Sequence, residues 1–406
     1  MLCQRQLPFG KHYSFINKGL DMKIAFFSWE AIHSVFVGGI GSHVTELACA
    51  LERKGHEVHV FTRMARPNHS RYECVHGVHY HRCAYVGNSD FIEEVANMCR
   101  SFVDSFLATE DYIGRFDVIH GHDWLTAQAL EWINLARRHK TIFTIHSTEY
   151  GRCGNNNFGG NSKRIRHLEW LGSYCCDRVI TVSNALKNEA MWLYNIPEAK
   201  TDVVYNGVSC SDFNSWIDPG GVRRQYGIGP MDPMVLDVGR LVYQKGPDLL
   251  VSAIPYILNY HPNAKFVFVG DGEMKAEVEQ QARNIGVSHA TRFVGKQGSN
   301  ALRDLFKATD CVCVPSRNEP FGIVILEAWS SGKPVVATVN GGPNEIVWHD
   351  VNGLKIQDNP QSIAWGIGTI FEDFDHARWM GHNGRMTVET AFSWDTIAEE
   401  TLQTYN

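Results

Sequence analysis

The chain has 406 residues, of which 44% are hydrophobic and 20% charged, and its formal net charge at pH 7 is -6. These values are typical of a globular protein with two domains of about 200 residues each. The negative net charge gives no indication of nucleic-acid binding. No run of about 18 apolar residues occurs, so no transmembrane helix is expected.

Residues 1–21 lack the apolar core of a signal peptide, and we predict that they form a disordered extension. From Lys23 onward, strand-like runs alternate with helix-like stretches. In the first half the predicted strands are 23–28, 57–61, 77–86, 117–120, 140–146, 178–183 and 202–205. In the second half they are 234–239, 265–270, 291–295, 311–315, 334–338 and 353–356. This alternation predicts an α/β protein with two doubly wound, Rossmann-like parallel sheets.

A polar, turn-rich segment from Asn206 to about Pro230 is predicted to link the two sheets. We therefore expect a first domain at residues 22–210, a second at 211–388 and a C-terminal helix at 389–406. Open α/β sheets bind ligands at the carboxyl ends of their strands. The ligand is thus expected in a cleft between the two domains.

The loop after the first predicted strand is rich in glycine. Gly38 and Gly39 begin a Gly-Gly-Ile-Gly string that opens a predicted helix. Such residues allow backbone N–H groups to approach a phosphate closely. Their spacing differs from the dinucleotide fingerprint G-x-G-x-x-G, so that kind of site is not indicated.

Two further strands of the first half end in polar residues. Asp123 and Trp124 follow one of them, and His146 ends the next. Both strand ends are expected to point into the cleft. Asp123 can accept hydrogen bonds from the hydroxyls of an acceptor sugar, while Trp124 stacks on the sugar or packs beneath it. The polar, glycine-rich segment 151–160 is predicted to be a mobile loop.

Two other features of the first half admit two interpretations each. The basic amphipathic stretch 163–171 either packs its apolar face into the core, which we favour, or lies on a membrane surface. Histidines cluster at His76, His79 and His81 and again at His120 and His122. Two of the first group share a strand face, which can bind a metal ion or simply be a polar face. We favour the polar face, because no third ligand lies nearby in the sequence.

Eleven cysteines are scattered along the chain without any C-x-x-C pair. Neither their spacing nor their odd number suits a zinc site or a disulfide framework. We therefore expect reduced cysteines, mostly buried, in a cytoplasmic protein.

Two cations follow directly on the first predicted strand of the second half. Arg240 and Lys245 lie in the string Gly-Arg-Leu-Val-Tyr-Gln-Lys-Gly. Arginine and lysine make strong charge-assisted contacts with phosphate oxygens. A diphosphate, with its roughly two negative charges, suits this pair.

The most informative segment runs from residue 318 to 328, between a predicted buried strand and a predicted helix. Glu319 lies in the loop, and Glu327 lies about one turn into the helix. The helix N-terminus, at Phe321, Gly322 and Ile323, can hold a phosphate, and the carboxylates can hold sugar hydroxyls. Together they predict a nucleotide-sugar site.

These strings resemble the motifs of retaining glycosyltransferases with the GT-B fold, particularly family four. The glutamate pair, the string of Arg240 and Lys245 and the Gly-Gly loop all match, and the resemblance extends from about Met22 to the C-terminus. The string from His122 to Ala127 is similar to that of glycogen and starch synthases. Those enzymes carry a lysine just before the Gly-Gly loop, where this chain has Phe36-Val37.

The resemblance implies a role for each residue. Arg240 and Lys245 would hold the donor diphosphate, Glu319 would position the donor sugar, and Glu327 would bind the ribose. His146 matches a histidine that lies near the donor sugar. The resemblance also implies front-face attack without a protein general base, and a final helix that crosses back to the first domain.

No metal ion or other cofactor is expected. The D-x-D string that holds a metal ion in the other large glycosyltransferase fold occurs only at residues 373–375, in a predicted helical region. The implied reaction moves a sugar, with glucose the first choice, from a nucleotide-diphosphate sugar to a sugar or α-glucan acceptor. The alternatives are mannosyl or N-acetylglucosaminyl transfer to a small-molecule or lipid acceptor, a sugar-nucleotide epimerase of the same fold, and a non-catalytic carbohydrate-binding protein.

Overall fold

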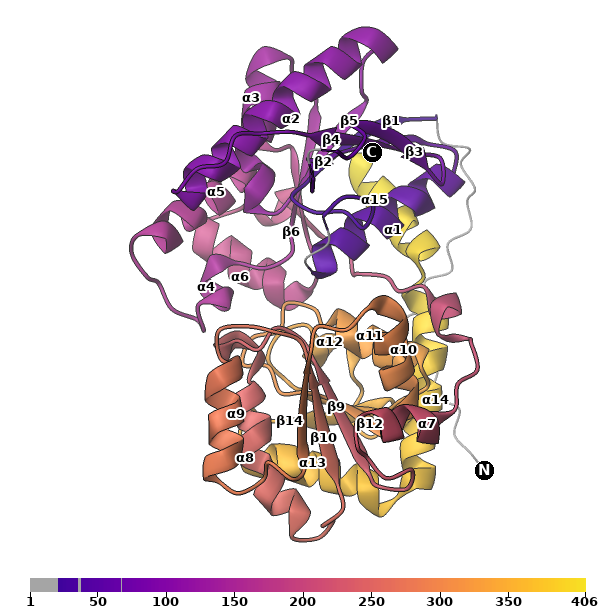
Figure 1. The fold of residues 1–406 in the computed structure, drawn as a ribbon. Helices are drawn as coiled ribbons and strands as arrows, with labels where there is room; N and C mark the ends of the chain where they lie inside the picture. The colour runs from indigo at the N-terminus through magenta and orange to yellow at the C-terminus, as the bar shows by residue number, and fades with distance from the viewer. Residues whose placement is uncertain (1–20, 36–37, 67) are drawn as a thin grey trace.

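Two α/β domains lie one above the other in the computed structural model, which describes residues 21–35, 38–66 and 68–406 (Figure 1). The predicted pair of sheets is confirmed. Of the predicted extension at 1–21 only Asp21 is described, and Phe36 and Val37 also lie outside the described residues. No described helix is both long enough and apolar enough to span a membrane.

The first domain is built on an eight-stranded sheet in the spatial order β3-β4-β2-β1-β5-β6-β7-β8. Its strands are β1 (Lys23–Ser28), β2 (Glu57–Arg63), β3 (Tyr72–Val75), β4 (Val78–Cys83), β5 (Val118–His122), β6 (Lys140–Ile145), β7 (Arg178–Thr181) and β8 (Thr201–Val203). Its helices are α1 (Gly39–Arg53), α2 (Phe91–Ile113), α3 (Ala127–Ala136), α4 (Glu149–Arg152), α5 (Asn161–Cys175), α6 (Asn184–Tyr194) and the C-terminal α15 (Trp394–Tyr405).

The second domain is built on a six-stranded sheet in the order β11-β10-β9-β12-β13-β14. Its strands are β9 (Met234–Val238), β10 (Lys265–Val269), β11 (Thr291–Gly295), β12 (Cys311–Val314), β13 (Val335–Thr338) and β14 (Gly353–Ile356). Its helices are α7 (Pro219–Gln225), α8 (Pro247–Leu258), α9 (Lys275–Asn284), α10 (Ser299–Ala308), α11 (Ile323–Ser330), α12 (Pro343–Ile346), α13 (Pro360–Glu372) and α14 (Phe374–Ala391).

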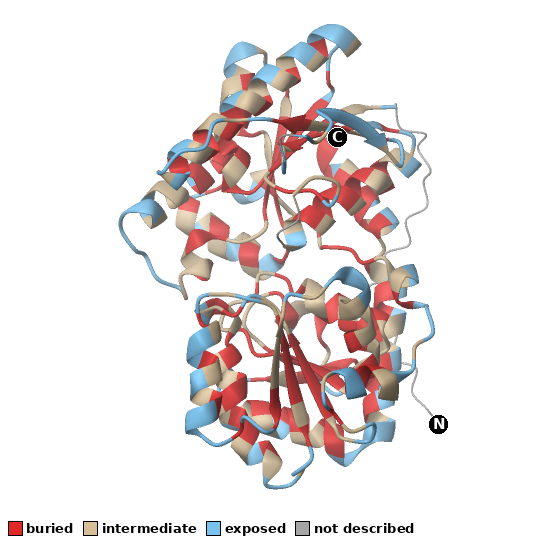
Figure 2. Ribbon diagram, in the orientation of Figure 1, coloured by how far each residue is buried: buried red, intermediate tan, exposed pale blue. Residues whose placement is uncertain are grey.

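The strands form because short apolar runs are covered by helices on both faces of each sheet (Figures 1 and 2). In β12, for example, all four residues are buried. Parallel strands buried in this way are near-continuous apolar runs, which is why every predicted strand is present. The sequence did not predict β3, an exposed edge strand that pairs antiparallel with β4.

The predicted linker is wrong in its second half. Residues 219–225 form α7, whose Val222 and Arg223 are buried. The guanidinium of Arg223 pairs with Asp310 at 2.9 Å, so this helix is part of the second domain. The Pro219-Gly220-Gly221 start suggested a turn, but proline at the first position of a helix is favourable.

The chain passes between the domains twice, and the two passages lie side by side. The backbone N–H of Val208 donates to the carbonyl oxygen of Phe392 at 2.9 Å. A Cβ atom on Gly207 would lie only 2.7 Å from the Trp394 ring, so only glycine allows this contact. Beyond the second passage, α15 packs against α1 in the first domain. The two passages therefore form a narrow double hinge.

Each sheet has one point where the strand order changes direction, between β1 and β5 in the first domain and between β9 and β12 in the second. Ligands of doubly wound folds bind beyond the carboxyl ends of the strands at this switch point. The loops that follow these four strands are thus the first place to look for a site.

Candidate active site

The predicted site residues follow the four strands that flank the two switch points. Gly38 and Gly39 follow β1, Asp123 follows β5, Arg240 follows β9 and Glu319 follows β12. Residues that are almost 300 positions apart in the chain are therefore brought to facing edges of two sheets.

The Gly-Gly loop meets the second domain at the start of α11. A Cβ atom on Gly39 would lie 3.1 Å from Cδ1 of Ile323, so a larger side chain at residue 39 would require the Ile323 side chain of the other domain to shift by a few tenths of an ångström. The backbone N–H of Gly38 donates to Oε2 of Glu30 at 2.7 Å. Because α1 begins at Gly39 and α11 at Ile323, two helix N-termini, each with a partial positive charge, lie next to each other.

Glu319 and Lys245 form an ion pair in the cleft. The Lys245 ammonium donates to Oε2 of Glu319 at 2.7 Å, and the Ser316 hydroxyl donates to the same oxygen at 2.9 Å. Glu319 is buried, and its backbone N–H donates to the carbonyl oxygen of Asn340 at 3.1 Å. A carboxylate and a cation are thus held side by side, as the junction between a sugar and a phosphate requires.

Arg240 lies on the same wall with its charge available. It is exposed, and Nη2 donates to Oε1 of Gln244 at 3.1 Å. Within the described part of the chain it forms no ion pair with a carboxylate. Its guanidinium can therefore bind an anion without breaking an existing salt bridge.

Glu327 lies in the second turn of α11, as predicted. Its carboxyl group is half-buried and makes no hydrogen bond or ion pair with other described residues. Burial raises its pKa to about 7, although the charge of Arg303 opposes this shift. A half-buried carboxyl group that no described residue occupies is free to accept a hydrogen bond from a ligand such as a ribose hydroxyl.

Phe321 lies where its ring cannot contact a ligand in the cleft. The ring is 2% exposed and stacks on Tyr205, with ring centroids 5.7 Å apart, close to Phe392. The predicted binding role thus does not extend to this side chain, which packs in the hinge. Gly322 adopts φ = 96°, a conformation that favours glycine, and turns the chain into α11.

Asp123 is used to hold the backbone of the neighbouring strand end. It is 4% exposed, and Oδ1 accepts from the N–H of His146 at 2.7 Å. Burial raises its pKa to about 6, against the opposing effects of Arg152 and of the backbone N–H groups of His146 and Ser147. The contact that the structure shows for Asp123 is internal, and its contact with an acceptor sugar stays a prediction. Trp124 is buried and contacts the ring of Phe91 edge-on, so its ring packs within the first domain.

His146 is half-buried and lies beside two buried imidazoles, those of His43 and His122. Nδ1 of His122 and Nε2 of His146 are 3.2 Å apart, and Nδ1 of His43 lies 2.7 Å from Oδ1 of Asn206. Burial lowers the pKa of His146 to about 3 and the pKa values of His43 and His122 well below the usual range. The rings are therefore neutral at pH 7.

Two histidine groups bear on metal binding. Ring nitrogens of His43, His122 and His146 lie within 4.8 Å of one another, the one arrangement among the described residues that would fit a metal ion. His79 and His81 form no such group within those residues. Nε2 of His81 lies 2.9 Å from Nδ1 of His59, and this contact between polar rings agrees with a polar strand face.

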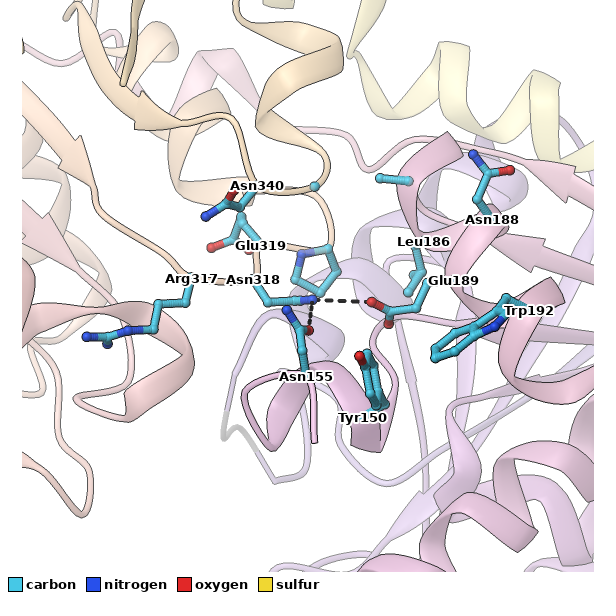
Figure 3. Close-up of a pocket in the computed structure, with 13 residues that line it drawn as sticks. Tyr150, Asn155, Leu186, Asn188, Glu189, Trp192, Arg317, Asn318, Glu319 and Asn340 are labelled. Atoms are coloured by element: carbon cyan, nitrogen blue, oxygen red, sulfur yellow. Dashed lines mark hydrogen bonds between the residues drawn. The ribbon is translucent and has the colours of Figure 1, made fainter. Parts of the chain in front are cut away.

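A pocket of about 470 Å³ opens between the domains beside Glu319 (Figure 3). Asn318 reaches across it, and Nδ2 donates to Oδ1 of Asn155 at 3.0 Å and to Oε2 of Glu189 at 3.3 Å. Tyr150 and Trp192 bring aromatic rings to the same pocket. Sequence reasoning pointed to the loop that contains Asn155 and to the segment that begins at Asn318, but it missed the α6 residues, which lie in no recognisable motif.

Further contacts hold the domains together next to this pocket. Glu345 of α12 accepts from the backbone N–H groups of Asn184 at 3.0 Å and of Ala185 at 2.7 Å, at the N-terminus of α6. The Ser183 hydroxyl donates to the carbonyl oxygen of Pro320 at 2.6 Å. The described conformation is therefore one in which the two walls of the site are in contact.

The sequence matches two family models. Residues 37–212 match Glycosyltransferase Family 4, and residues 222–387 match Glycosyl transferases group 1. The chain is 38% identical over 388 residues to an uncharacterized glycosyltransferase of Methanocaldococcus jannaschii, with coverage of 95% of this chain and 98% of the relative. It is 31% identical over 402 residues to a glycogen synthase of Mycobacterium tuberculosis, with coverage of 95% and 94%.

The fold is similar to that of a solved sucrose-phosphate synthase from Thermosynechococcus elongatus. The TM-score is 0.79 at 26% sequence identity, and the match covers 95% of this chain and 98% of that one. The two facing sheets, the motif residues at their switch points and the extent of these matches agree with one another. The chain belongs to glycosyltransferase family 4, has the GT-B fold and is a glycosyltransferase.

Proposed function

We propose that the protein is a retaining hexosyltransferase that moves glucose from a nucleotide-diphosphate sugar to a sugar or α-glucan acceptor. The observation that carries this proposal is the 2.7 Å ion pair between Lys245 and Glu319. The pair supports the proposal because a cation suited to phosphate and a carboxylate suited to hydroxyls lie side by side, which is the order of groups across the bond that a transferase breaks.

The donor is held mainly by the second domain. Arg240 and Lys245 bind the diphosphate, helped by the N-termini of α1 and α11. Glu327 accepts a hydrogen bond from the ribose, and Glu319 accepts from hydroxyls of the donor sugar. Neutral His146 adds a hydrogen bond to that sugar from the first domain.

The reaction proceeds on one face of the donor sugar. The bond between the anomeric carbon and the phosphate oxygen breaks, and the acceptor oxygen bonds to the same face of that carbon. The acceptor proton passes to the departing phosphate oxygen, so no protein base is required. The developing negative charge is stabilised by Arg240, Lys245 and the two helix N-termini.

The acceptor occupies the pocket next to Glu319. The amides of Asn155 and Asn318 and the carboxylate of Glu189 suit sugar hydroxyls, and Tyr150 and Trp192 offer ring faces. On glucose transfer, product analysis by proton NMR should show an α-linkage formed from an α-linked donor. A β-linked product would overturn the retaining assignment.

A donor panel tests the donor assignment. UDP-, ADP- and GDP-linked glucose, mannose and N-acetylglucosamine are each incubated with and without a maltooligosaccharide acceptor, and nucleoside diphosphate release is measured. We expect acceptor-stimulated release with one glucose donor. A preference for mannose or N-acetylglucosamine would overturn the assignment of glucose as the donor sugar. Release without transfer would indicate an epimerase-type or hydrolytic reaction.

Transfer is proposed to need no metal ion, because Arg240, Lys245 and helix dipoles handle the charge of the leaving group. A chelator should leave the rate nearly unchanged. This test can fail clearly, because His43, His122 and His146 form a group that would fit a metal ion. Loss of activity in chelator, restored by a divalent ion but not in a His43→Asn variant, would contradict metal independence and locate the ion.

We place the enzyme in the cytoplasm. The ten cysteines in the described part of the chain are all free, which suits a reducing compartment. Cell fractionation that found the protein outside the cytoplasm would contradict this assignment.

A further inference from the structure

A second pocket lies next to the active-site cleft on the surface of the first domain. It has a volume of about 560 Å³ and lies between α5, α6 and the loop before α5. Trp192 lines both this pocket and the cleft pocket beside Glu319. The loop borders both as well, through Asn155 on the cleft side and Asn157 on the other. A ligand that extends out of the cleft would therefore meet the second pocket next.

The charges that line this pocket are all potentially positive. Its lining residues are Asn157, Lys163, Arg166, His167, Trp170, Trp192, Leu193 and Tyr194, and none of them is acidic. Within the described residues, neither Lys163 nor Arg166 forms an ion pair. Nη1 of Arg166 is buried and has no hydrogen-bond partner there.

The neighbouring Arg164 shows what a structural arginine on this helix does. Nη1 pairs with Asp90 at 2.5 Å and Nη2 with Glu93 at 3.1 Å, so α5 is tied to α2. Arg166, two positions later in the same helix, has no such carboxylate. Because Arg166 lines the pocket without a carboxylate partner among the described residues, its charge is not already paired and can attract an anionic ligand.

Aromatic rings complete the pocket. On α5, His167 stacks on Trp170 and Trp170 on Tyr174, with ring centroids 5.5 Å and 5.1 Å apart. Trp192 is 67% exposed, which is unusual for so large an apolar group, and contacts Tyr150 edge-on. Exposed ring faces can stack against the apolar faces of pyranose units, because both surfaces are then removed from water.

We propose that this pocket binds an anionic unit of the acceptor, so that the natural acceptor is a saccharide that carries a phosphate or a carboxylate group. Lys163 and Arg166 hold the anionic group, and Trp170 and Trp192 hold the sugar ring. The unit that receives the transferred sugar lies in the cleft beside Glu319. This inference rests on the proposed transferase function and narrows its acceptor from any sugar or glucan to an acidic one.

Three of these residues, Lys163, Arg166 and Trp170, belong to the stretch 163–171 that the sequence allowed to lie on a membrane. The pocket favours a saccharide, because its cations and rings face a concavity instead of forming a continuous apolar face. Anionic lipid vesicles are therefore included in the test as the competing ligand.

The test uses the double variant Lys163→Gln/Arg166→Gln and, as its matched control, Arg164→Gln on the same helix outside the pocket. Tryptophan fluorescence is titrated with glucose 6-phosphate, glucuronate and glucose, with the donor site saturated by nucleoside diphosphate. The parent and the control should bind both anionic sugars at least about tenfold more tightly than glucose. The double variant should lose that preference.

The single variant Lys163→Gln, at an exposed position, should show a partial loss of the preference even if the double variant melts at a lower temperature.

Kinetics with a phosphorylated and a neutral disaccharide acceptor give the second readout. The double variant should raise KM for the phosphorylated acceptor about tenfold or more, and leave kcat and donor hydrolysis without acceptor unchanged. Equal KM values of the parent for the two acceptors would overturn the proposal. So would loss of vesicle binding in the double variant with sugar-phosphate binding intact. If no donor supports transfer at all, the proposed function fails, while the fluorescence titration still decides whether the pocket selects anionic sugars.

Discussion

The two walls of the cleft differ in how they carry charge. The wall from the second domain presents several ionisable groups. They are the ion pair of Lys245 and Glu319, Arg240 without an ion pair within the described residues, and a half-buried Glu327. The wall from the first domain presents His146, neutral because burial lowers its pKa to about 3, held by Asp123.

This difference separates two tasks. The second domain can recognise a charged nucleotide at long range, because its cations are accessible. Near the donor sugar, the first domain contributes the neutral ring of His146, whose backbone is fixed by its contact with Asp123. Substitutions on the two walls should therefore differ both in size and in the step that they affect.

The largest effect is expected for Lys245→Ala. It removes a positioned charge from the leaving diphosphate and leaves the buried Glu319 without its cation. We expect the activation free energy for kcat/KM, measured by nucleoside diphosphate release, to rise by about 2–4 kcal/mol. Lys307→Ala, a cation of the same domain on α10, should leave the rate unchanged. Equal rates for the Lys245 variant and the parent would remove the diphosphate assignment.

Glu327→Gln should weaken nucleotide binding and stabilise the free protein above neutral pH. The ribose loses a charged acceptor, which costs about 1.5–3 kcal/mol of affinity in calorimetry. The pKa of Glu327 is raised to about 7, above its unfolded value near 4.5, so its stability contribution is complete below pH 4.5 and is lost as pH rises through 7. Glutamine has no such loss.

Thermal melts of the free Glu327→Gln variant and the parent at pH 6 and pH 8 check the second half of that expectation. The variant should gain about 1–2 kcal/mol relative to the parent between these two pH values. A relative stability that does not change with pH would show that the carboxyl group is ionised at no cost in the free protein.

On the first-domain wall, the two substitutions of Asp123 should differ from each other. Asp123→Ala removes the acceptor of the His146 N–H and should raise the activation free energy for kcat/KM by about 1–2 kcal/mol. Asp123→Asn keeps an oxygen at that place and should remain within about threefold of the parent. If both variants raised the acceptor KM equally, a charged contact with the acceptor would explain Asp123 better than its positioning role.

The smallest effect is expected where the walls meet. In Glu345→Gln, the charge at the N-terminus of α6 is lost while its hydrogen-bonding oxygen remains. A charge at a helix N-terminus contributes about 0.3–1 kcal/mol, so the donor KM should rise about two- to fivefold with little change in kcat. Solution scattering with a donor analogue should show a smaller radius of gyration than without it, and the Glu345 variant should need more analogue for the same change.

The sequence predicted those features of the structure that depend on a short, continuous run of residues. Buried parallel strands such as β12 are apolar runs, so the architecture followed from the sequence. The exposed edge strand β3 and helix α7, which begins with Pro-Gly-Gly, lack that signal and were missed. The motif residues Arg240, Lys245, Glu319 and Glu327 each lie in one continuous string.

The rest of the site arises from contacts between segments distant in sequence. Glu189 and Trp192 line the cleft because α6 faces Asn318 across the domain boundary, a relation that no string of residues contains. Phe321 lies within a motif, yet its ring packs against Tyr205. Asp123 likewise bonds to the backbone of His146. A motif can thus locate a segment of the chain without telling which way each side chain points.

The double hinge at Val208 and Phe392 has a consequence for how the site is assembled in each catalytic cycle. Two adjacent chain segments joined by a hydrogen bond resist twisting and separation, but they allow rotation about the line through them. We therefore expect the domains to close mainly by rotation about this one axis. Little conformational entropy remains to be lost when the donor closes the cleft. We therefore expect each turnover to bring the two walls of the site back to the same relative position.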